Sequence, residues 1–327
     1  MRRRSFIGLF ASAAALSIAT PAAPKSAPVI GYLHFSNPAE HTGGPLHAAF
    51  VKGLNDGGFF IDKNVAIEYR WAEGKYENSR EMVADLIGKN VDVIVAFGPP
   101  LARAAKEGTS TIPIVFEVGN DAVEAGLVTS LSRPGGNATG INVLFTQVTP
   151  KLLEIIAELV PQGKTFGLLV NPGSPTAEPN IKLAKEAATA KGGQLVVLKA
   201  NTPSEIDAAF EGASDAHVEA VIVGADPFLG NQRKQLVVQA ANHKMPAIYF
   251  ASGFTVGGGL ISYGANLAAV YRRMGVYAGH ILMGEKPSDL PVEQPTKFDF
   301  VINLKTARAL GLDLPPLLVA RADEVIE

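Results

Sequence analysis

The sequence predicts an α/β protein of two lobes, each a doubly wound parallel sheet, joined by a hinge of several strands. Three observations predict it. Short apolar runs alternate with amphipathic segments from Pro28 almost to the C-terminus. The runs are apolar throughout, which is typical of strands buried on both faces of a parallel sheet. The scheme repeats in the second half, and 327 residues are enough for two cores.

In the first half, strands and helices are expected to alternate. The first helix ends at a pair of glycines, Ser79 caps the second, and a Gly-Pro-Pro turn closes the third strand. Polar and apolar residues alternate between Val65 and Trp71, which indicates a strand with one exposed face. The expected strands are 29–33, 65–71, 91–97 and 114–118, and the expected helices are 46–56, 79–89 and 101–107.

The second half continues in the same way without a low-complexity linker, so the lobes should be joined by crossing backbone segments. We expect these crossings near 139–142, near 263–264 and at 287–295. The first lobe would then comprise 29–141 plus 265–290, and the second 142–264 plus 291–327. The expected strands are 165–170, 195–199, 220–224, 247–251 and 260–263, and the expected helices are 177–190, 204–211, 232–242 and 267–282.

The N-terminus has the layout of an export signal over residues 1–23. Three arginines precede an apolar run at 6–19 that is too short to span a membrane, and small residues suited to cleavage follow. The segment from Arg3 to Ile7 also fits the twin-arginine pattern, so general secretion and twin-arginine export both stay open. The mature protein is expected to work outside the cytoplasm.

Composition narrows the functional classes. The chain has no cysteine, which excludes a disulfide framework, a thiolate metal site, a cysteine nucleophile and a lipid-bearing cysteine. An exported protein without an anchor is most useful to its cell when an outer membrane confines it, so we expect a periplasmic location. The sequence contains 29 Lys and Arg residues and 31 Asp and Glu residues, so no basic surface for nucleic acid is expected.

Ligands of open parallel sheets bind beyond the carboxyl ends of the strands, and the loops there supply the candidate site. Carboxylates in these loops would hold an ammonium group, serines and helix-start amides near Pro100 and Thr176 would hold a carboxylate, and phenylalanines would form apolar walls. The candidate ligand-binding residues are Ser36, Asn37, Phe97, Gly98, Pro99, Glu117, Asn120, Asp121, Asn171, Ser174, Asp226, Phe228, Ser252 and Phe254.

Purely structural roles are open for several of these residues. Asp121 and Ser174 are equally suited to capping the helices that follow, and Asp226 with Pro227 is a common turn. A phenylalanine taken singly is more often core than pocket wall. The set as a whole carries the prediction, because the fold directs all of these loops toward one cleft.

Enzyme motifs are poorly represented. The sequence contains no G-x-S-x-G elbow, no Walker loop and no G-x-G-x-x-G after a strand, so no catalytic residue and no cofactor is expected. His34, His41 and His47 form the only histidine cluster. A metal site there is conceivable, but the spacing has no i,i+4 pair, so solvated or capping histidines and no metal are expected.

Two longer segments resemble a known family. Arg133 to Gly140 reads R-P-G-G-N-A-T-G and is followed by Lys151-Leu-Leu-Glu and Val160-Pro. Near the C-terminus come G-E-K-P-S-D-L-P from Gly284 and I-N-L-K-T-A from Ile302. Over residues 29–314 the chain resembles the substrate-binding proteins of bacterial ABC transporters with the type 1 periplasmic-binding fold, in the group associated with aromatic amino acid uptake.

The resemblance implies a receptor without enzymatic activity that closes its two lobes on a small solute and delivers it to a membrane permease, acting as a monomer. The family commonly has Asp-Pro where this chain has Asp121-Ala122, and Asp-Asn where it has Asp226-Pro227. Because Asp121, Asp226 or Glu117 could offset an ammonium group, and Ser174 with helix-start amides could hold a carboxylate, we expect an amino acid or a related small zwitterion as the ligand. The alternatives are another solute (an aromatic acid, an amide or a sugar), a sensory receptor, or an enzyme such as a hydrolase or isomerase that uses the same cleft.

Overall fold

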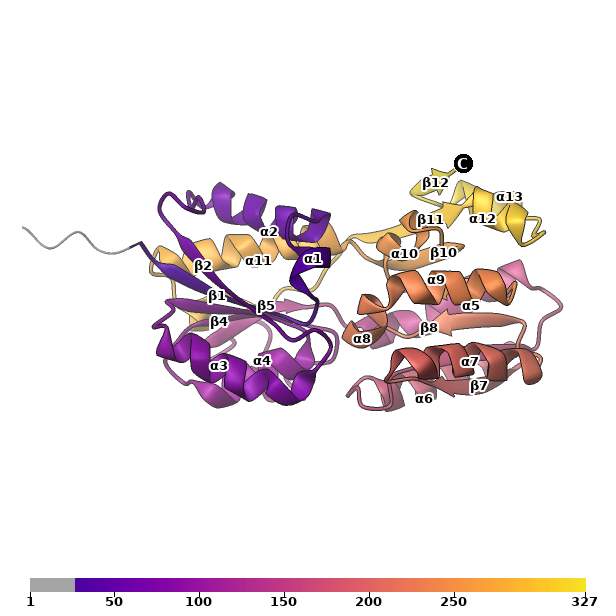
Figure 1. Ribbon diagram of the computed structural model, residues 1–327, viewed down its shortest axis with the longest axis horizontal. Helices are drawn as coiled ribbons and strands as arrows, with labels where there is room; N and C mark the ends of the chain where they lie inside the picture. The colour runs from indigo at the N-terminus through magenta and orange to yellow at the C-terminus, as the bar shows by residue number, and fades with distance from the viewer. Residues whose placement is uncertain (1–26) are drawn as a thin grey trace, which may run out of the picture.

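The computed structural model describes residues 27–327, and the predicted signal segment lies outside this range. Two lobes lie end to end, each an open sheet with helices on both faces (Figure 1). The first lobe contains a five-stranded parallel sheet in the order β2-β1-β3-β4-β5. Its strands are β1 (Val29–His34), β2 (Ala66–Trp71), β3 (Val93–Phe97), β4 (Ile114–Val118) and β5 (Ala138–Asn142).

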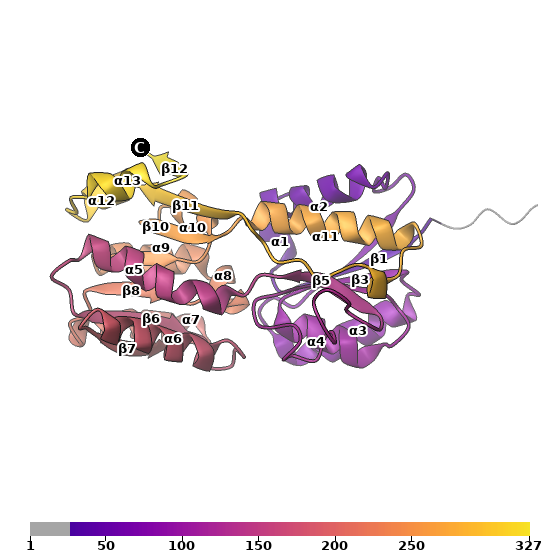
Figure 2. The same ribbon diagram turned by 180° about the vertical axis from the view of Figure 1, so that it is seen from behind.

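Helices cover both faces of this sheet. On one face, α2 (Pro45–Asp56) packs against the long helix α11 (Leu267–Leu282), which enters from the second lobe (Figure 2). On the other face lie α3 (Ser79–Gly88) and α4 (Pro99–Gly108). Two short elements lie in the strand-to-helix loops, α1 (Pro38–His41) and the 3-10 turn η1 (Tyr76–Asn78). Figure 1 shows α1 on the side of the first lobe that faces the second.

The second lobe contains a seven-stranded sheet in the order β12-β11-β10-β9-β8-β6-β7. Parallel pairing holds except between β10 and β11, which run antiparallel, so the expectation of wholly parallel sheets is wrong at this pair. The reason is that β11 arrives from the first lobe and therefore runs against β10. The strands are β6 (Thr165–Val170), β7 (Gln194–Lys199), β8 (Ala220–Val223), β9 (Ala247–Tyr249), β10 (Ile261–Ala265), β11 (Phe298–Asn303) and β12 (Glu324–Ile326).

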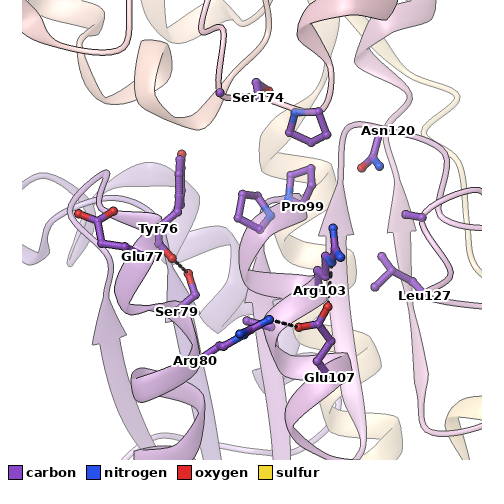
Figure 3. Close-up of a pocket in the computed structure, with 15 residues that line it drawn as sticks. Tyr76, Glu77, Ser79, Arg80, Pro99, Arg103, Glu107, Asn120, Leu127 and Ser174 are labelled. Carbon is purple, nitrogen blue, oxygen red and sulfur yellow. Dashed lines mark hydrogen bonds and ion pairs between the residues drawn. The ribbon is translucent and has the colours of Figure 1, made fainter.

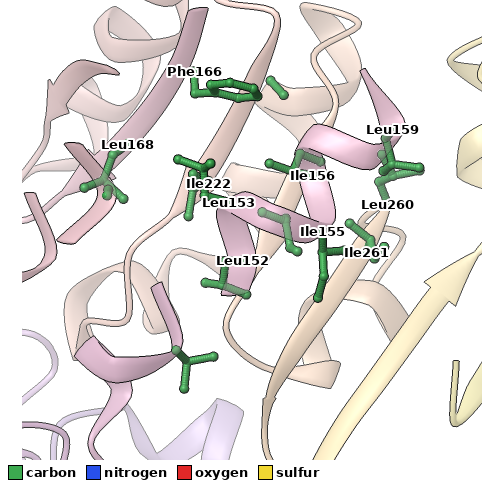
Figure 4. Close-up of a cluster of buried hydrophobic side chains, with 14 of the residues drawn as sticks. Leu152, Leu153, Ile155, Ile156, Leu159, Phe166, Leu168, Ile222, Leu260 and Ile261 are labelled. Carbon is green, nitrogen blue, oxygen red and sulfur yellow. The ribbon is translucent and has the colours of Figure 1, made fainter. Parts of the chain in front are cut away.

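The core of the second lobe lies on both faces of its sheet. On one face, Leu152 and Ile156 of α5 pack with Phe166, Ile222 and Ile261 from the strands beneath (Figure 4). The helices of this face are α5 (Thr149–Leu159), α6 (Ala177–Ala190), α12 (Leu304–Ala309) and α13 (Pro316–Ala320). Those of the other face are α7 (Pro203–Asp215), α8 (Pro227–Asn231), α9 (Arg233–Asn242) and α10 (Ser252–Val256). The two-lobed α/β prediction is confirmed.

Three backbone segments connect the sheets. The first runs from β5 through η2 (Phe145–Val148), the second from β10 into α11, and the third from η3 (Pro287–Asp289) to β11. Before it crosses, the third segment pairs with β5: Asn142 N–H donates to the Glu293 carbonyl (2.8 Å) and Glu293 N–H donates to that of Gly140 (3.0 Å). Phe145 and Phe298 pack against core clusters of both lobes. Within residues 27–327, no helix has the length and apolarity to cross a membrane.

Candidate ligand-binding site

A cavity of about 640 Å³ lies between the lobes. Most of its lining comes from the first lobe: the loop after β2, the facing sides of α3 and α4, and the loop after β4. The loop after β6 closes it from the second lobe (Figure 3). The lining residues are Tyr76, Glu77, Ser79, Arg80, Pro99, Pro100, Arg103, Ala104, Glu107, Asn120, Ala125, Leu127, Gly173, Ser174 and Pro175.

Two polar atoms in this lining lack partners. The hydroxyl of Tyr76 and the Oδ1 atom of Asn120 are buried and make no hydrogen bond among the described residues. The Tyr76 hydroxyl comes near the backbone of Phe228 and the Asp226 carboxylate, both in the second lobe. A buried polar atom without a partner costs free energy, so a ligand donor that reached either atom would be stabilised.

The loop that carries Asn120 is fixed by one buried amide. Asn142 Oδ1 accepts from Ala122 N–H (3.1 Å), and its Nδ2 donates to the carbonyls of Asn120 (2.6 Å) and Val118 (3.3 Å). Asn142 lies on β5 with no exposed surface, so the loop is tied to the sheet. Asp121 Oδ1 accepts from Val123 N–H (2.7 Å) and Glu124 N–H (3.0 Å), so it caps a turn; the helix expected after it does not form.

On the first-lobe wall, two arginines share one carboxylate. Arg103 Nε donates to Glu107 Oε1 (2.9 Å), and Arg80 Nη2 donates to Glu107 Oε2 (3.1 Å). These two hydrogen bonds, first that of Arg103 and then that of Arg80, lower the pKa of Glu107 below its ordinary value. Two guanidinium groups and one carboxylate carry a net charge of about +1 at neutral pH.

On the second-lobe side, Asp226 caps the short helix α8. Its Oδ1 accepts from Phe228 N–H (2.8 Å), Leu229 N–H (3.2 Å) and Asn171 Nδ2 (3.2 Å). Burial raises the pKa of Asp226, while these donors act in the opposite direction. The carboxylate therefore belongs to the capping structure, and its charge also faces the Tyr76 hydroxyl across the interlobe gap.

The lobes touch beside the cavity. Asn231 Nδ2 of the second lobe donates to the Phe35 carbonyl of the first (2.9 Å). Gly98 has a φ of +90°, and a Cβ there would lie 3.3 Å from Pro227 Cγ and 3.6 Å from the Phe35 ring. A larger residue at 98 would therefore strain the backbone and crowd the contact between the lobes.

The structure brings three of the predicted site residues to the cavity: Pro99, Asn120 and Ser174. Others shape its neighbourhood, because Asn171 Oδ1 accepts from Gly173 N–H (2.9 Å) and Ser36 N–H donates to His34 Nδ1 (3.0 Å). Asn37 and Ser252 are half-buried at element starts, whereas Phe97, Phe228 and Phe254 are buried in the hydrophobic cores of their lobes.

Glu117 is buried at the carboxyl end of β4, facing Tyr271 of α11. Burial raises the pKa of Glu117 to about 7. It does not line the cavity.

The expectation of solvated histidines is wrong: His34, His41 and His47 are buried beside the first-lobe loops. Each ring nitrogen Nε2 lies close to a phenol, at 2.8 Å from Tyr271 for His34, 2.8 Å from Tyr32 for His41 and 2.9 Å from Tyr69 for His47. Burial lowers the pKa of all three, that of His41 to about 4. Among the described residues, no group of three metal-ligating side chains is placed to hold a metal ion.

Sequence reasoning missed Tyr76 and the arginine pair. Tyr76 lies in the loop after β2, at the carboxyl end of that strand, where ligands of parallel sheets bind. The candidate residues came from the other loops of this kind and did not include this one. Arg80 and Arg103 reach the cavity from the sides of helices, where the rule does not apply. The only sequence signal was the i,i+4 spacing of Arg103 and Glu107.

A cavity with charged and unpartnered polar groups, between two lobes joined by crossing strands, defines the class of two-lobed solute receptors. The chain matches the ABC transporter substrate binding protein family over residues 40–326 and belongs to that family. It is a solute-binding receptor with the type 1 periplasmic-binding fold.

Similar proteins agree with this assignment. A tyrosine-binding protein of Clostridioides difficile is 26% identical over 263 residues, which are 80% of this chain and 75% of the relative. A domain from Streptococcus pneumoniae in complex with L-Trp has 25% identity and a TM-score of 0.80, covering 92% of this chain and all of the other. A ligand-free, open substrate-binding protein from Clostridium difficile is 26% identical and has a TM-score of 0.64. The match covers 92% of this chain and 99% of the other.

Proposed function

We propose that the mature chain works in the periplasm as a monomeric, non-enzymatic receptor that captures an amino acid in the interlobe cavity and presents it to an ABC permease. The observation that carries the ligand class is the Tyr76 hydroxyl, which has no hydrogen-bond partner among the described residues and lies near the Asp226 carboxylate. An ammonium group has three donors and a positive charge, so it would donate to the Tyr76 hydroxyl and gain from the nearby Asp226 carboxylate.

Among amino acids, we propose one with an aromatic side chain as the ligand that fits the cavity best. The Tyr76 ring and the proline rings Pro99, Pro100 and Pro175 line the cavity from both lobes (Figure 3). The Tyr76 ring can pair with an aromatic ligand, which adds about 0.5–1.5 kcal/mol beyond burial, and the proline rings supply further apolar surface. The relatives named for tyrosine and crystallised with L-Trp support the same class.

Closure would couple binding to delivery. Ligand contacts from both lobes exist only when the lobes are close together, so the ligand must favour that arrangement. The interlobe contact between Asn231 and Phe35, and the higher TM-score to the L-Trp complex than to the open relative, support a closed-like state.

Calorimetry with L-tyrosine and L-tryptophan tests the proposal. Asp226→Asn keeps an oxygen for the α8 cap but removes the charge, so we expect affinity to fall at least about 10-fold. Neither Asp226 nor Asp121 lines the cavity itself, but Asp226 is the one that acts on Tyr76, so Asp121→Asn, which alters the other capping carboxylate, should change affinity less than about 2-fold. Equal affinity in wild type and Asp226→Asn would remove Asp226 from the site, and no binding of any amino acid would overturn the ligand class.

A further inference from the structure

The first-lobe wall of the cavity contains an arginine, Arg103, whose side chain is 76% exposed and whose guanidinium forms one contact within the described part of the protein. Arg103 uses only Nε, in its bond to Glu107, and its two Nη groups make no hydrogen bond or ion pair within residues 27–327. Figure 3 shows the guanidinium pointing up toward the Asn120 side of the cavity, with Glu107 below it. Nη groups free in this way present a two-pronged donor edge to whatever occupies the cavity.

The helix starts nearby offer few alternatives for binding an anion. Because α4 begins with Pro99 and Pro100, its first two positions have no N–H, and Ala102 N–H already donates to the Gly98 carbonyl (3.0 Å). This removes most of the backbone donors that make a helix N-terminus an anion site.

The second-lobe loop is equally short of donors. Gly173 N–H and Ser174 N–H both donate to Asn171, at 2.9 Å and 3.0 Å. Ala177 N–H donates to the Ser174 carbonyl (3.1 Å), and Thr176 N–H lies 3.4 Å from Ser174 Oγ. The expected helix-start amides near Thr176 are therefore already engaged within the loop itself.

We propose that Arg103 binds the carboxylate of the ligand through its Nη groups, and that Glu107 and Arg80 are positioning residues that hold its guanidinium. This inference rests on the proposed function and adds to it a requirement for a free carboxylate. A planar guanidinium pairs with both oxygens of a carboxylate, and an ammonium in its place does not. Arg103 Nε donates to Glu107, which orients the guanidinium, and Arg80 Nη2 donates to the same carboxylate from α3.

Three probes separate the two ends of the ligand: L-tyrosine, L-tyrosinamide without the carboxylate, and 3-(4-hydroxyphenyl)propionate without the ammonium. Affinities are measured by calorimetry for the full mature chain and for Arg103→Gln, Arg103→Lys and Glu107→Gln. The matched control is Arg272→Gln, since Arg272 forms a comparable exposed ion pair with Asp56 (2.8 Å) on the α2–α11 side of the lobe, away from the cavity lining.

We expect Arg103→Gln to lower the affinity for L-tyrosine about 10- to 100-fold, as for the loss of a charged hydrogen-bond pair. Arg103→Lys should recover only part of this loss. Tyrosinamide should bind weakly to the wild type and should not lose further affinity in Arg103→Gln. Glu107→Gln should lower the affinity for L-tyrosine and leave the affinity for tyrosinamide unchanged. A general loss of folding would not produce this pattern. Arg272→Gln should match the wild type for all probes.

The outcomes distinguish this inference from the function on which it rests. Tyrosine binding that is equally strong in Arg103→Gln overturns the role of Arg103 and leaves the amino acid receptor standing. Binding of the propionate alone, lost in Arg103→Gln, supports Arg103 and overturns the amino acid assignment. If the wild type binds none of the probes, both are overturned.

Discussion

Arg273 on α11 donates two hydrogen bonds to Glu293 on the third crossing segment, from Nε to Oε2 (2.8 Å) and from Nη2 to Oε1 (2.6 Å). The Tyr277 hydroxyl, one turn further along α11, lies 3.0 Å from the same carboxylate and 2.7 Å from the Pro291 carbonyl, and it donates its single proton to one or the other. The Arg273 guanidinium also lies over the Tyr277 ring, 4.7 Å from its centroid. The crossing segment is thereby fixed to the first lobe immediately before it leaves for the second.

Glu293→Gln should loosen this anchor. Both partners are more than a third exposed, so solvent screens the pair and we expect a loss of about 1 kcal/mol in the free energy of unfolding, measured by urea denaturation. Ligand affinity should fall about 2- to 5-fold, because the freed crossing favours open arrangements.

The control for the anchor is Glu158→Gln, which breaks a similar contact to Arg321 (3.0 and 2.8 Å) on the second lobe, far from the crossings. It should lower stability to a similar degree without changing affinity. If the two variants bind ligand equally well, the ion pair at the crossing has no part in closure.

Two glycines allow α2 and α11 to touch backbone to backbone. A Cβ at Gly275 would lie 2.1 Å from the Phe50 carbonyl oxygen, and one at Gly53 would lie 1.8 Å from that of Arg272. Gly275→Ala should therefore force the helices apart and reduce the free energy of unfolding by about 3 kcal/mol or more, measured by chemical denaturation.

Gly212→Ala is the matched control for this helix contact. Gly212 lies inside α7, and a methyl group added there would have no atom of the neighbouring elements within 4 Å. Alanine at this position should therefore stabilise the protein by about 0.5–1 kcal/mol. A Gly275→Ala protein as stable as the wild type would show that the helices adjust without cost.

Much of the fold could be predicted because it depends on local pattern. Helices α6 and α11 begin and end where the apolar spacing placed them, at 177–190 and 267–282. The antiparallel pairing of β10 and β11 could not be predicted this way, since it depends on the direction in which a distant crossing returns.

The site was predictable to a smaller extent. Asn120 and Ser174 follow from the rule that ligands bind beyond the carboxyl ends of parallel strands. The burial of His34 has no local signal, because its partner Tyr271 is 237 positions away in the sequence. Arg103 was missed because a residue on the side of a helix reaches the cavity only once α3 and α4 are packed together.

The buried histidines make stability depend on pH. The pKa of His41 falls from about 6.5 in the unfolded chain to about 4 in the folded protein. The unfolded state therefore binds more protons between these values, and stability is full above pH 6.5 and declines as pH falls toward 4. For this one group the total loss is about 3 kcal/mol.

His41→Gln should flatten the slope of unfolding free energy against pH between about 6.5 and 4, measured by urea denaturation at several pH values. Glutamine keeps a polar partner for the Tyr32 hydroxyl, which now lies 2.8 Å from His41 Nε2. The control is His217→Asn, which replaces an exposed histidine at a φ of +51°, a conformation that asparagine accepts. Identical slopes for both variants would contradict the assignment.

The amide of Asn142 links the sheet to the cavity, so its loss should affect both stability and binding. Asn142→Asp replaces two donated hydrogen bonds, to the carbonyls of Asn120 and Val118, with a carboxylate oxygen facing carbonyl oxygens in a fully buried place. We expect a loss of about 3 kcal/mol in the free energy of unfolding, because the new charge has no partner there. Ligand affinity should fall as well, since Asn120 loses its fixed position.

Asn64→Asp provides the comparison. Asn64 has the same pattern of contacts, donating to the Gly58 carbonyl (2.8 Å) and accepting from Phe60 N–H (2.7 Å), but it is exposed. Its substitution should cost less than about 1 kcal/mol and leave affinity unchanged, because water solvates the new carboxylate. Urea denaturation and calorimetry on both variants decide the matter: an Asn142→Asp protein that binds L-tyrosine as tightly as the Asn64→Asp control would show that the Asn120 loop holds its shape without this amide.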